Sequence, residues 1–366
     1  MFFVLLSHFG FTFFPNQADP LPTAMRFVGM VASPTFMMLS GLILGFLYRT
    51  SPGNFERLRV KLADRGLFLL TAGHLVLLAS HPLYTWRFFH ITDTIGVCML
   101  VQPWVVSKLR PRDRLLLSAA LFVGSWTLVE RWLPTGPIAH VLKETFFGSL
   151  TAQNYYRFAF PVVPWFSLDL AATSLGDYVG THYLRGDDSG IQRLLMRTAS
   201  AALIVSASGR AIYHVLLRLV PGNSAMIAAG RVSSLFQKQP PGLLYIFFYG
   251  AIGLWLVSAC LYLERTGHLP RQFGFVTMLG RTSLFVFLAH WFVYLIAIMS
   301  LRDRLPFVRA WPVYFIASVA LVTWSAVAWY RLDCNRFITV GYARLHERLL
   351  RWRLSHVNAE PTASQG

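Results

Sequence analysis

Residues 242–263, GLLYIFFYGAIGLWLVSACLYL, contain no charged side chain over their whole length. A helix of this length can cross the hydrocarbon core of a membrane, which is roughly 30 Å thick. Residues 311–330 are uncharged in the same way. Apolar runs of this length are typical of transmembrane helices rather than of soluble helices, which keep one polar face. The two segments therefore predict an integral membrane protein of the all-α class.

The composition of the chain favours the same class. Hydrophobic residues make up 55% of the 366 residues and charged residues 13%, with a mean hydropathy of +0.50. We predict a bundle of about ten transmembrane helices in one membrane domain over residues 1–340, followed by a basic interfacial segment and a polar tail over residues 341–366. The predicted spans are 1–14, 27–48, 66–81, 89–107, 114–133, 157–180, 196–219, 242–263, 282–301 and 311–331.

The net charge of +17 is better explained by membrane topology than by nucleic acid, because the basic residues form short clusters between apolar runs. Lys and Arg accumulate in cytoplasmic loops. We therefore expect three basic segments on the cytoplasmic side: the loop after the second span, the loop after the fourth span, and the C-terminal tail. This predicts N-in, C-in topology, in a bacterial inner membrane. The apolar start lacks a basic leader and a cleavage pattern, so we expect a retained helix. The contrast is weaker in two predicted outer segments, which also carry basic residues: Arg231, Lys238, Arg302, Arg304 and Arg309.

The sequence indicates no metal or disulfide chemistry. Cys98, Cys260 and Cys334 are far apart and have no CxxC spacing. There is also no metal-ligand cluster and no Gly-rich phosphate loop that would favour a metal cofactor or ATP hydrolysis.

Titratable residues inside the predicted spans are functional candidates, because a charge at membrane depth costs about 2.5–3.5 kcal/mol. For each histidine the alternative is a neutral ring bonded to a hydroxyl or carbonyl group. The candidates are His8, His74, His90, Asp93, Asp169, Arg210, His214 and His290.

His8 precedes the polar turn at residues 15–20, which places it near the outer half of the bundle as a candidate base. Asp93 follows His90 by three residues, so the two share a helix face and could form a His–carboxylate pair that orients the ring. The alternative is an interfacial ion pair at a helix end.

Arg210 and His214 have i, i+4 spacing and suit an anionic ligand such as a phosphate. They could equally contact Asp169 or a lipid headgroup. Pro161 and Pro164 predict a broken or kinked helix in the sixth span. Broken helices at membrane depth usually line a cavity, although kinks without function are also common.

Four motifs follow one another along roughly residues 1–300. They are His8 with ASPTFMMLSG (32–41), HITDTIGV (90–97), FPVVPW (160–165) with LG (175–176), and KQPPGLLY (238–245) with LGRTSLF (279–285) and His290. In this order they resemble the membrane acyltransferases related to heparan-alpha-glucosaminide N-acetyltransferase, including bacterial relatives, and more distantly the acyltransferase-3 family.

The resemblance implies transfer of an acyl group, typically acetyl from acetyl-CoA, to an amine or hydroxyl of a sugar or envelope glycan. A first-helix histidine is implicated in this family, and His8 matches it by position. His8 could act as a base or accept the acyl group transiently. Asp93 is the second catalytic candidate. The substrate-binding candidates are His90, Asp169, Arg210, His214, Arg281 and His290.

The anionic head of an acyl-CoA donor predicts a basic approach from the cytoplasmic side, for which the candidates are Arg57, Arg59 and Lys61. Topology alone is the alternative explanation of these charges. The expected partners are acyl-CoA, a glycan acceptor and membrane lipids, with a homodimer left open and no nucleic acid.

The sequence departs from the family pattern in two places. Relatives usually carry a charged lead-in with an Asp and an Arg-Gly pair before the histidine, whereas this sequence starts Met1-Phe2-Phe3. We therefore expect a short first helix, with either a start codon assigned too late or a protein that lacks a conventional N-terminal anchor. Ser167 and Asp169 stand where relatives tend to be apolar or glycine-rich, which could tune acceptor choice.

Two other classes of protein fit the composition. A transporter or flippase would use broken helices and buried charges as a pathway. Many transporters consist of two repeated halves with matching interrupted helices. The sequence has no second segment that matches the Pro161–Pro164 break, and this favours the enzyme. A structural subunit of an envelope complex would leave the buried titratable residues without a purpose.

Overall fold

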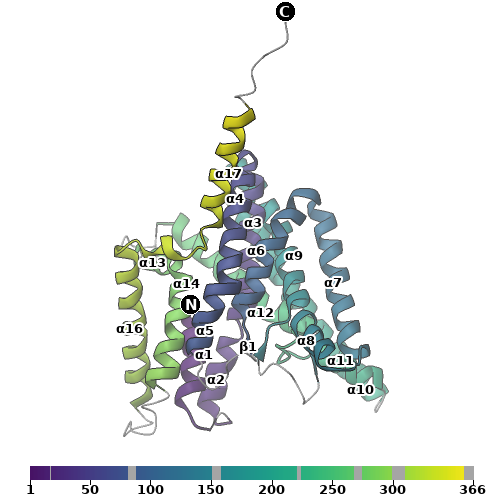
Figure 1. Ribbon diagram of the computed structural model, residues 1–366. Coiled ribbons are helices and arrows are strands. Elements are labelled where there is room, and N and C mark those ends of the chain that lie inside the picture. Colours follow the sequence, from purple (N-terminus) through teal and green to yellow (C-terminus); the bar gives the residue numbers. More distant parts are fainter. Residues whose placement is uncertain are drawn as a thin grey trace, which may run out of the picture.

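The computed structural model describes residues 1–16, 18–80, 88–150, 158–220, 224–267, 274–298 and 310–357, and these are helical almost throughout (Figure 1). The longer helices are α1 (Phe2–Phe13), α2 (Pro20–Gly29), α3 (Ala32–Thr50), α4 (Phe55–Phe68), α6 (Ile91–Lys108), α7 (Pro111–Arg131), α9 (Val162–Leu184), α10 (Asp188–Leu219), α12 (Leu243–Arg265), α16 (Trp311–Arg331) and α17 (Tyr342–Val357). The shorter ones are α5 (His74–Ser80), α8 (Pro137–Phe146), α11 (Ser224–Val232), α13 (Gly274–Arg281) and α14 (Ser283–Trp291), with π-helical turns η2 (Leu69–Gly73) and η4 (Phe292–Ile298).

The predicted all-helical class is confirmed. Five helical stretches among the described residues are long and apolar enough to cross a membrane: Pro20–Thr50, Pro52–Ser80, Asp188–Leu219, Leu243–Arg265 and Trp311–Arg331. Each of the ten predicted spans overlaps a helix, and the count of ten membrane crossings stays a prediction. Residues 15–26, which were predicted to connect the first two spans, are partly helical, because α2 already begins at Pro20. Arg302, Arg304 and Arg309 lie outside the described residues.

Helices α3 and α9 form the centre of the bundle and touch through glycines. A Cβ atom on Gly41 would lie 2.0 Å from the carbonyl oxygen of Asp169, and one on Gly45 would lie 1.9 Å from that of Thr173. From the other side, a Cβ on Gly176 would meet the backbone of Leu42 at 2.0 Å. Small residues at helical spacing let two backbones approach this closely in a membrane, where packing rather than water drives association.

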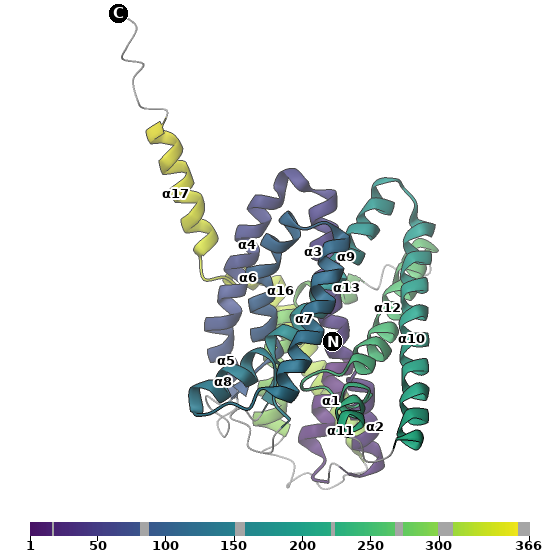
Figure 2. The ribbon, with the colours of Figure 1, turned by 90° about the vertical axis from the view of Figure 1, so that its right-hand side faces the viewer.

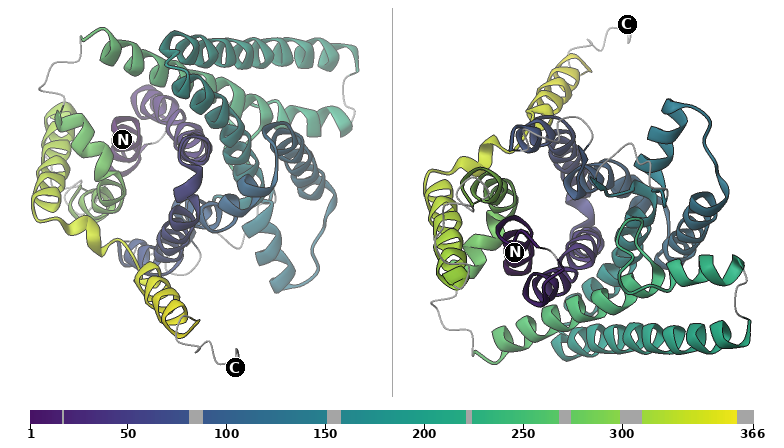
Figure 3. Two further views of the ribbon diagram at one scale, coloured as in Figure 1. Left: turned by 90° about the horizontal axis from the view of Figure 1, so that it is seen from above. Right: turned by 90° about the horizontal axis from the view of Figure 1, so that it is seen from below.

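Two groups of helices flank this centre. On one side α10 packs along α12, and on the other α14 packs against α16, as seen along the bundle in Figure 3. Stacked and edge-on aromatic rings join α1 to the second group, with Phe9 packed against both Phe315 and Tyr294. Large aromatic rings of this kind bury much apolar area.

Two short strands lie at one end of the bundle. β1 (Phe88–Phe89) and β2 (Phe158–Ala159) pair in parallel, and each leads directly into a helix. The predicted kink at Pro161 and Pro164 is wrong, because α9 begins after Pro161 and carries Pro164 in its first turn. Proline is tolerated there because the first-turn amides have no partner within the helix.

The end opposite β1 is held by buried charges. Arg114 is fully buried and bonds the Asp177 carboxylate at 2.6 Å, while Asp64 on α4 accepts the backbone N–H of Val340 and of Tyr342 at 3.2 and 2.9 Å. These last bonds fix the start of α17, which projects away from the bundle in Figure 2. The basic segment predicted before the tail is therefore helical.

Candidate functional site

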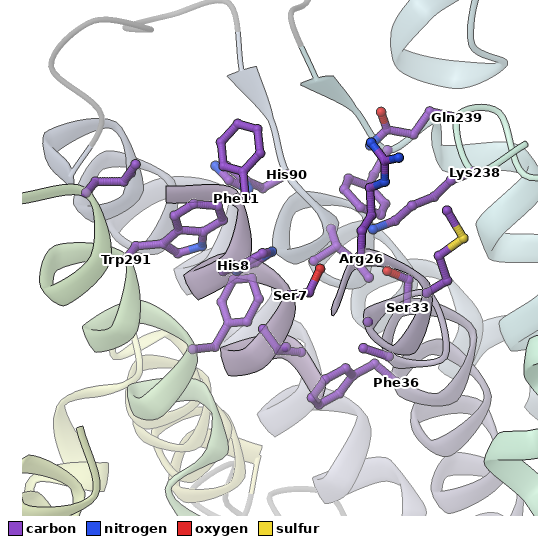
Figure 4. A pocket seen from close by; sticks show the side chains of 18 of the residues that line it. Ser7, His8, Phe11, Arg26, Ser33, Phe36, His90, Lys238, Gln239 and Trp291 are labelled. Carbon is purple, nitrogen blue, oxygen red and sulfur yellow. The ribbon is translucent and has the colours of Figure 1, made fainter. Parts of the chain in front are cut away.

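A cavity of about 510 Å³ opens among α1, α2, the start of α3 and the start of α6. This volume is typical of a small-molecule site. Figure 4 shows its lining residues converging from segments that are far apart in the sequence. Its polar and charged lining residues are Ser7, His8, Arg26, Ser33, His90, Lys238 and Gln239, and Trp291 and Phe160 contribute aromatic wall.

His8 is held by a second histidine. Its Nδ1 atom lies 2.7 Å from Nε2 of the fully buried His290, and Nδ1 of His290 lies 3.2 Å from the carbonyl oxygen of Val286. Because a carbonyl oxygen only accepts, His290 donates through Nδ1 and a neutral ring accepts at Nε2. His8 then donates through its own Nδ1, and its basic lone pair is on Nε2. A second ring group that fixes tautomer and orientation is a common device for a general base.

Trp291 completes the surroundings of His8. The two ring centroids are 4.3 Å apart, and the ring of His90 meets the other edge of Trp291 at 5.7 Å. Trp291 thus forms an aromatic wall beside both histidine rings.

Asp93 sits behind the cavity wall. Its buried carboxylate accepts the backbone N–H of His90 at 2.7 Å and lies 3.0 Å from Nδ1 of His74. The side chain of His90 in turn accepts the backbone N–H of Asp93. The expected pairing of Asp93 with a histidine ring thus occurs, but the ring belongs to His74, and Asp93 holds His90 through the start of α6.

The cavity carries positive charge. Arg26 and Lys238 line it together with two histidines, and none of its lining residues is acidic. Lys238 is half-buried in the turn before α12, and burial lowers its pKa to about 8. Its Nζ atom lies 5.3 Å from the centre of the Phe160 ring.

The other predicted site residues lie elsewhere. Asp169 is fully buried between α3 and α9, next to Cys98 and Gln102. Arg210 and His214 are on α10, with Arg210 over the ring of Tyr213. Arg281 ends α13 and bonds the Tyr330 hydroxyl at 3.3 Å. None of these lines the cavity, and their binding roles stay predictions.

The predicted donor-binding residues are in the first turns of α4. Arg59 forms an ion pair with Glu56 and stacks 3.7 Å over the Trp104 ring. Arg57 and Lys61 lie on the same helix, which starts at the end of the bundle from which α17 projects (Figure 1). The cavity is toward the other end, near α2 and β1. Arg57, Arg59 and Lys61 therefore do not line the cavity, and their role in donor binding stays a prediction.

His74 was among the titratable candidates of the predicted spans but had no assigned role, and the sequence did not single out Arg26, Lys238 or Trp291 as site residues. Of these residues, Lys238 could have been identified from the sequence, because it is the first residue of the KQPPGLLY motif. The partnership of His74 with Asp93 and the place of Arg26 depend on tertiary packing alone. Within the described ranges, no three His, Cys, Asp or Glu side chains gather as a metal site would require.

Comparison with known proteins gives one match. The model of the family described as heparan-alpha-glucosaminide N-acetyltransferase, catalytic, matches residues 1–214. This range includes His8, His90 and Asp93 and ends before Lys238 and His290. No curated protein and no solved structure matches significantly.

Proposed function

Because the chain belongs to the family of the heparan-alpha-glucosaminide N-acetyltransferase catalytic domain, we propose that it transfers an acetyl group from acetyl-CoA to an amine or hydroxyl of a sugar in an envelope glycan. The family model covers more than half of the chain, and the family name supports the reaction type. The single observation that carries the proposal is the His8–His290 pair, with Nδ1 and Nε2 2.7 Å apart at the wall of a cavity of about 510 Å³.

The chemistry assigned to His8 is general base catalysis. Nε2 of His8 removes the proton from the acceptor amine or hydroxyl as its nitrogen or oxygen attacks the thioester carbonyl carbon. The bond from that carbon to sulfur then breaks, and the proton passes from Nε2 to the departing thiolate. The Nδ1–H of His8 stays bonded to His290 throughout, so the ring does not turn between the two steps. Such proton transfer contributes typically 10²–10⁴-fold to rate.

A second route would have His8 accept the acetyl group on Nε2 before the acceptor arrives. The two routes differ in kinetics. Direct transfer needs donor and acceptor bound together, whereas a transient acetyl-histidine gives ping-pong kinetics. Either route uses the same nitrogen, and both need His290 to hold the ring.

The basic residues support a donor approach from the cytoplasmic side. Arg57, Arg59 and Lys61 lie at the start of α4, and the N-termini of α7 and α17 at the same end carry further arginines. Lys and Arg gather on the cytoplasmic side of membrane proteins, so we expect the cavity, which is toward the opposite end of the bundle, to lie in the outer half. The cavity is too small for a whole CoA molecule, so we expect only the acetylated end of the donor to reach His8. This orientation agrees with an inner-membrane location.

The test uses purified protein in nanodiscs with radiolabelled acetyl-CoA and an extract of envelope glycans. We expect label to move to the glycan with wild-type protein and to stay on CoA with His8→Ala. His346→Ala, on the projecting helix α17, is the matched histidine control and should keep full activity. A wild-type protein that is folded and binds no acetyl-CoA would overturn the proposal.

A further inference from the structure

The charges of the cavity are one-sided. Arg26 and Lys238 are its two basic side chains apart from the histidines, and the carboxylates of the described residues form no ion pair with either. Some cations elsewhere in the described residues do have such partners: Arg114 and Arg49 contact Asp177, and Arg231 contacts Glu130. A pair of cations on one wall without a carboxylate between them repels itself, and an anionic ligand would relieve that repulsion.

Helix N-termini add to the positive potential. α3 begins at Ala32 and α6 at Ile91, and both of these residues line the cavity. α9 and α12 begin within a few residues of Phe160 and Gln239, which also line it. The start of a helix carries about half a positive charge from its aligned peptide dipoles. The starts of α6, α9 and α12 therefore add partial positive charge around the cavity that holds the two cations, whereas α3 continues α2 after only two turn residues and adds no free helix start.

The cations and the base are on different walls. Figure 4 shows Arg26 and Lys238 together on one side with Ser33, His8 and Trp291 on the other, and Ser7 between the two groups. Arg26 comes from α2 and Lys238 from the turn before α12, so the cation wall is built by segments that do not hold His8. A molecule that spans the cavity can put an anionic group on one wall and a nucleophile beside His8.

Given the proposed acetyl transfer, we propose that the acceptor is an anionic amino sugar whose carboxylate or phosphate group binds between Arg26 and Lys238. The guanidinium of Arg26 suits two-point bonding to either group, and the ammonium of Lys238 adds a point charge. The phosphates of the donor share this chemistry. The acceptor is favoured because the cavity is of small-molecule size and because the basic start of α4, at the far end of the bundle, offers the donor head a separate site.

The kinetic test compares glucosamine, glucosamine 6-phosphate and muramic acid as acceptors, in nanodiscs of uncharged phosphatidylcholine. For wild-type protein we expect kcat/KM to be about tenfold or more higher for the two anionic sugars, as one charge-assisted contact would give. Arg26→Gln and Lys238→Gln should each reduce this preference through KM of the sugar and leave KM of acetyl-CoA unchanged. Arg218→Gln, in the last turn of α10 and away from the cavity, should keep the preference.

The binding test is independent of turnover. The dissociation constants of glucosamine 6-phosphate and glucosamine are measured by calorimetry on wild-type protein and the two variants, without donor. If wild-type protein binds the phosphorylated sugar more tightly and both variants lose this difference, the anion site is supported. This holds even if no acetyl transfer is found, because the absence of transfer would overturn only the proposed function. Equal binding and equal kcat/KM for neutral and anionic sugars would overturn the anion site. If KM of acetyl-CoA rises in the Arg26→Gln and Lys238→Gln variants, while the preference for anionic sugars stays unchanged, the two cations bind the donor, and the proposed acceptor site is wrong.

Discussion

Nδ1 of His8 lies 2.7 Å from Nε2 of His290, although 282 positions separate the two residues in the sequence. This bond joins α1 to α14 at the cavity wall and fixes Nδ1 as the nitrogen of His8 that is bonded to His290. Because His290 itself donates to the carbonyl of Val286, its accepting nitrogen is fixed as well. His290 is thus a positioning residue for the proposed base.

We expect His290→Phe to lower kcat by about 10²-fold, because the ring of His8 loses the acceptor that orients it and stabilises its charged form. KM of acetyl-CoA should stay within about twofold. His290→Gln, which keeps an acceptor group, should recover a large part of kcat and shift the pH profile. The measurement is kcat against pH for the three proteins. Equal losses in both variants, with an unchanged profile, would mean that His290 serves packing only.

Asp93 gives a second prediction. Its carboxylate lies 3.0 Å from Nδ1 of His74 and accepts the N–H of His90 at 2.7 Å. In Asp93→Asn the charge is lost while the shape is kept, and a bond to a charged group contributes about 1.5–3 kcal/mol. We expect a lower melting temperature in detergent and a smaller kcat. His74→Gln should reproduce the loss of stability and spare most of kcat, since His74 does not line the cavity.

The glycines of the central helix pair give a third. Gly45→Ala would place its Cβ 1.9 Å from the carbonyl oxygen of Thr173, so the α3 and α9 backbones must separate. We expect destabilisation of more than about 2 kcal/mol, by analogy with other overpacked cores. Gly124→Ala is the matched control, because its Cβ would meet nothing within 4 Å and alanine favours a helix by up to about 1 kcal/mol. Thermal unfolding of both variants in one detergent decides the matter.

Arg114 gives a fourth. It is fully buried and bonds Asp177 at 2.6 Å and the carbonyl of Thr173 at 3.1 Å. Arg114→Met should destabilise the protein by about 3–5 kcal/mol, because it leaves a buried carboxylate with only the distant Arg49. The double variant with Asp177→Asn should recover part of this loss. No recovery in a double-mutant cycle would show that the two side chains act independently.

The pH dependence of the anion site gives a fifth. Burial lowers the pKa of Lys238 to about 8, so its cation is present below that pH and is lost above it. The ratio of kcat/KM for glucosamine 6-phosphate to that for glucosamine should therefore fall as the pH rises from about 7 to 9. Taking the ratio cancels the titration of His8, which acts on both sugars. Lys238→Arg should keep the ratio constant over this range.

The helices could be predicted from the sequence wherever an apolar run decides them, as for residues 242–263 and α12, Leu243–Arg265. His8 and His90 could be predicted as site residues because a titratable group in an apolar run is conspicuous, and the structure places both at the cavity. The wrong kink at Pro161 has a simple cause, because a proline that starts a helix and one that bends it look alike in sequence.

The remaining site residues depend on long-range contacts. The partner of Asp93 is His74, 19 positions away, and no helical spacing pairs the two. Arg26 falls between the predicted spans 1–14 and 27–48, and it reaches the cavity only because α2 packs along α1. Arg210 and His214 share a helix face as predicted, but that face is on α10, away from the cavity.

The glycine contact between α3 and α9 has a bearing on how such a protein can change over generations. Gly41, Gly45 and Gly176 tolerate almost no substitution, since any side chain there meets backbone. The cations of the cavity are on different segments, α2 and the turn before α12, whose replacement leaves that contact untouched. If the proposed anion site holds, lineages that inherit this scaffold can therefore exchange one sugar for another by altering Arg26 or Lys238, while the contact between α3 and α9 is passed on intact.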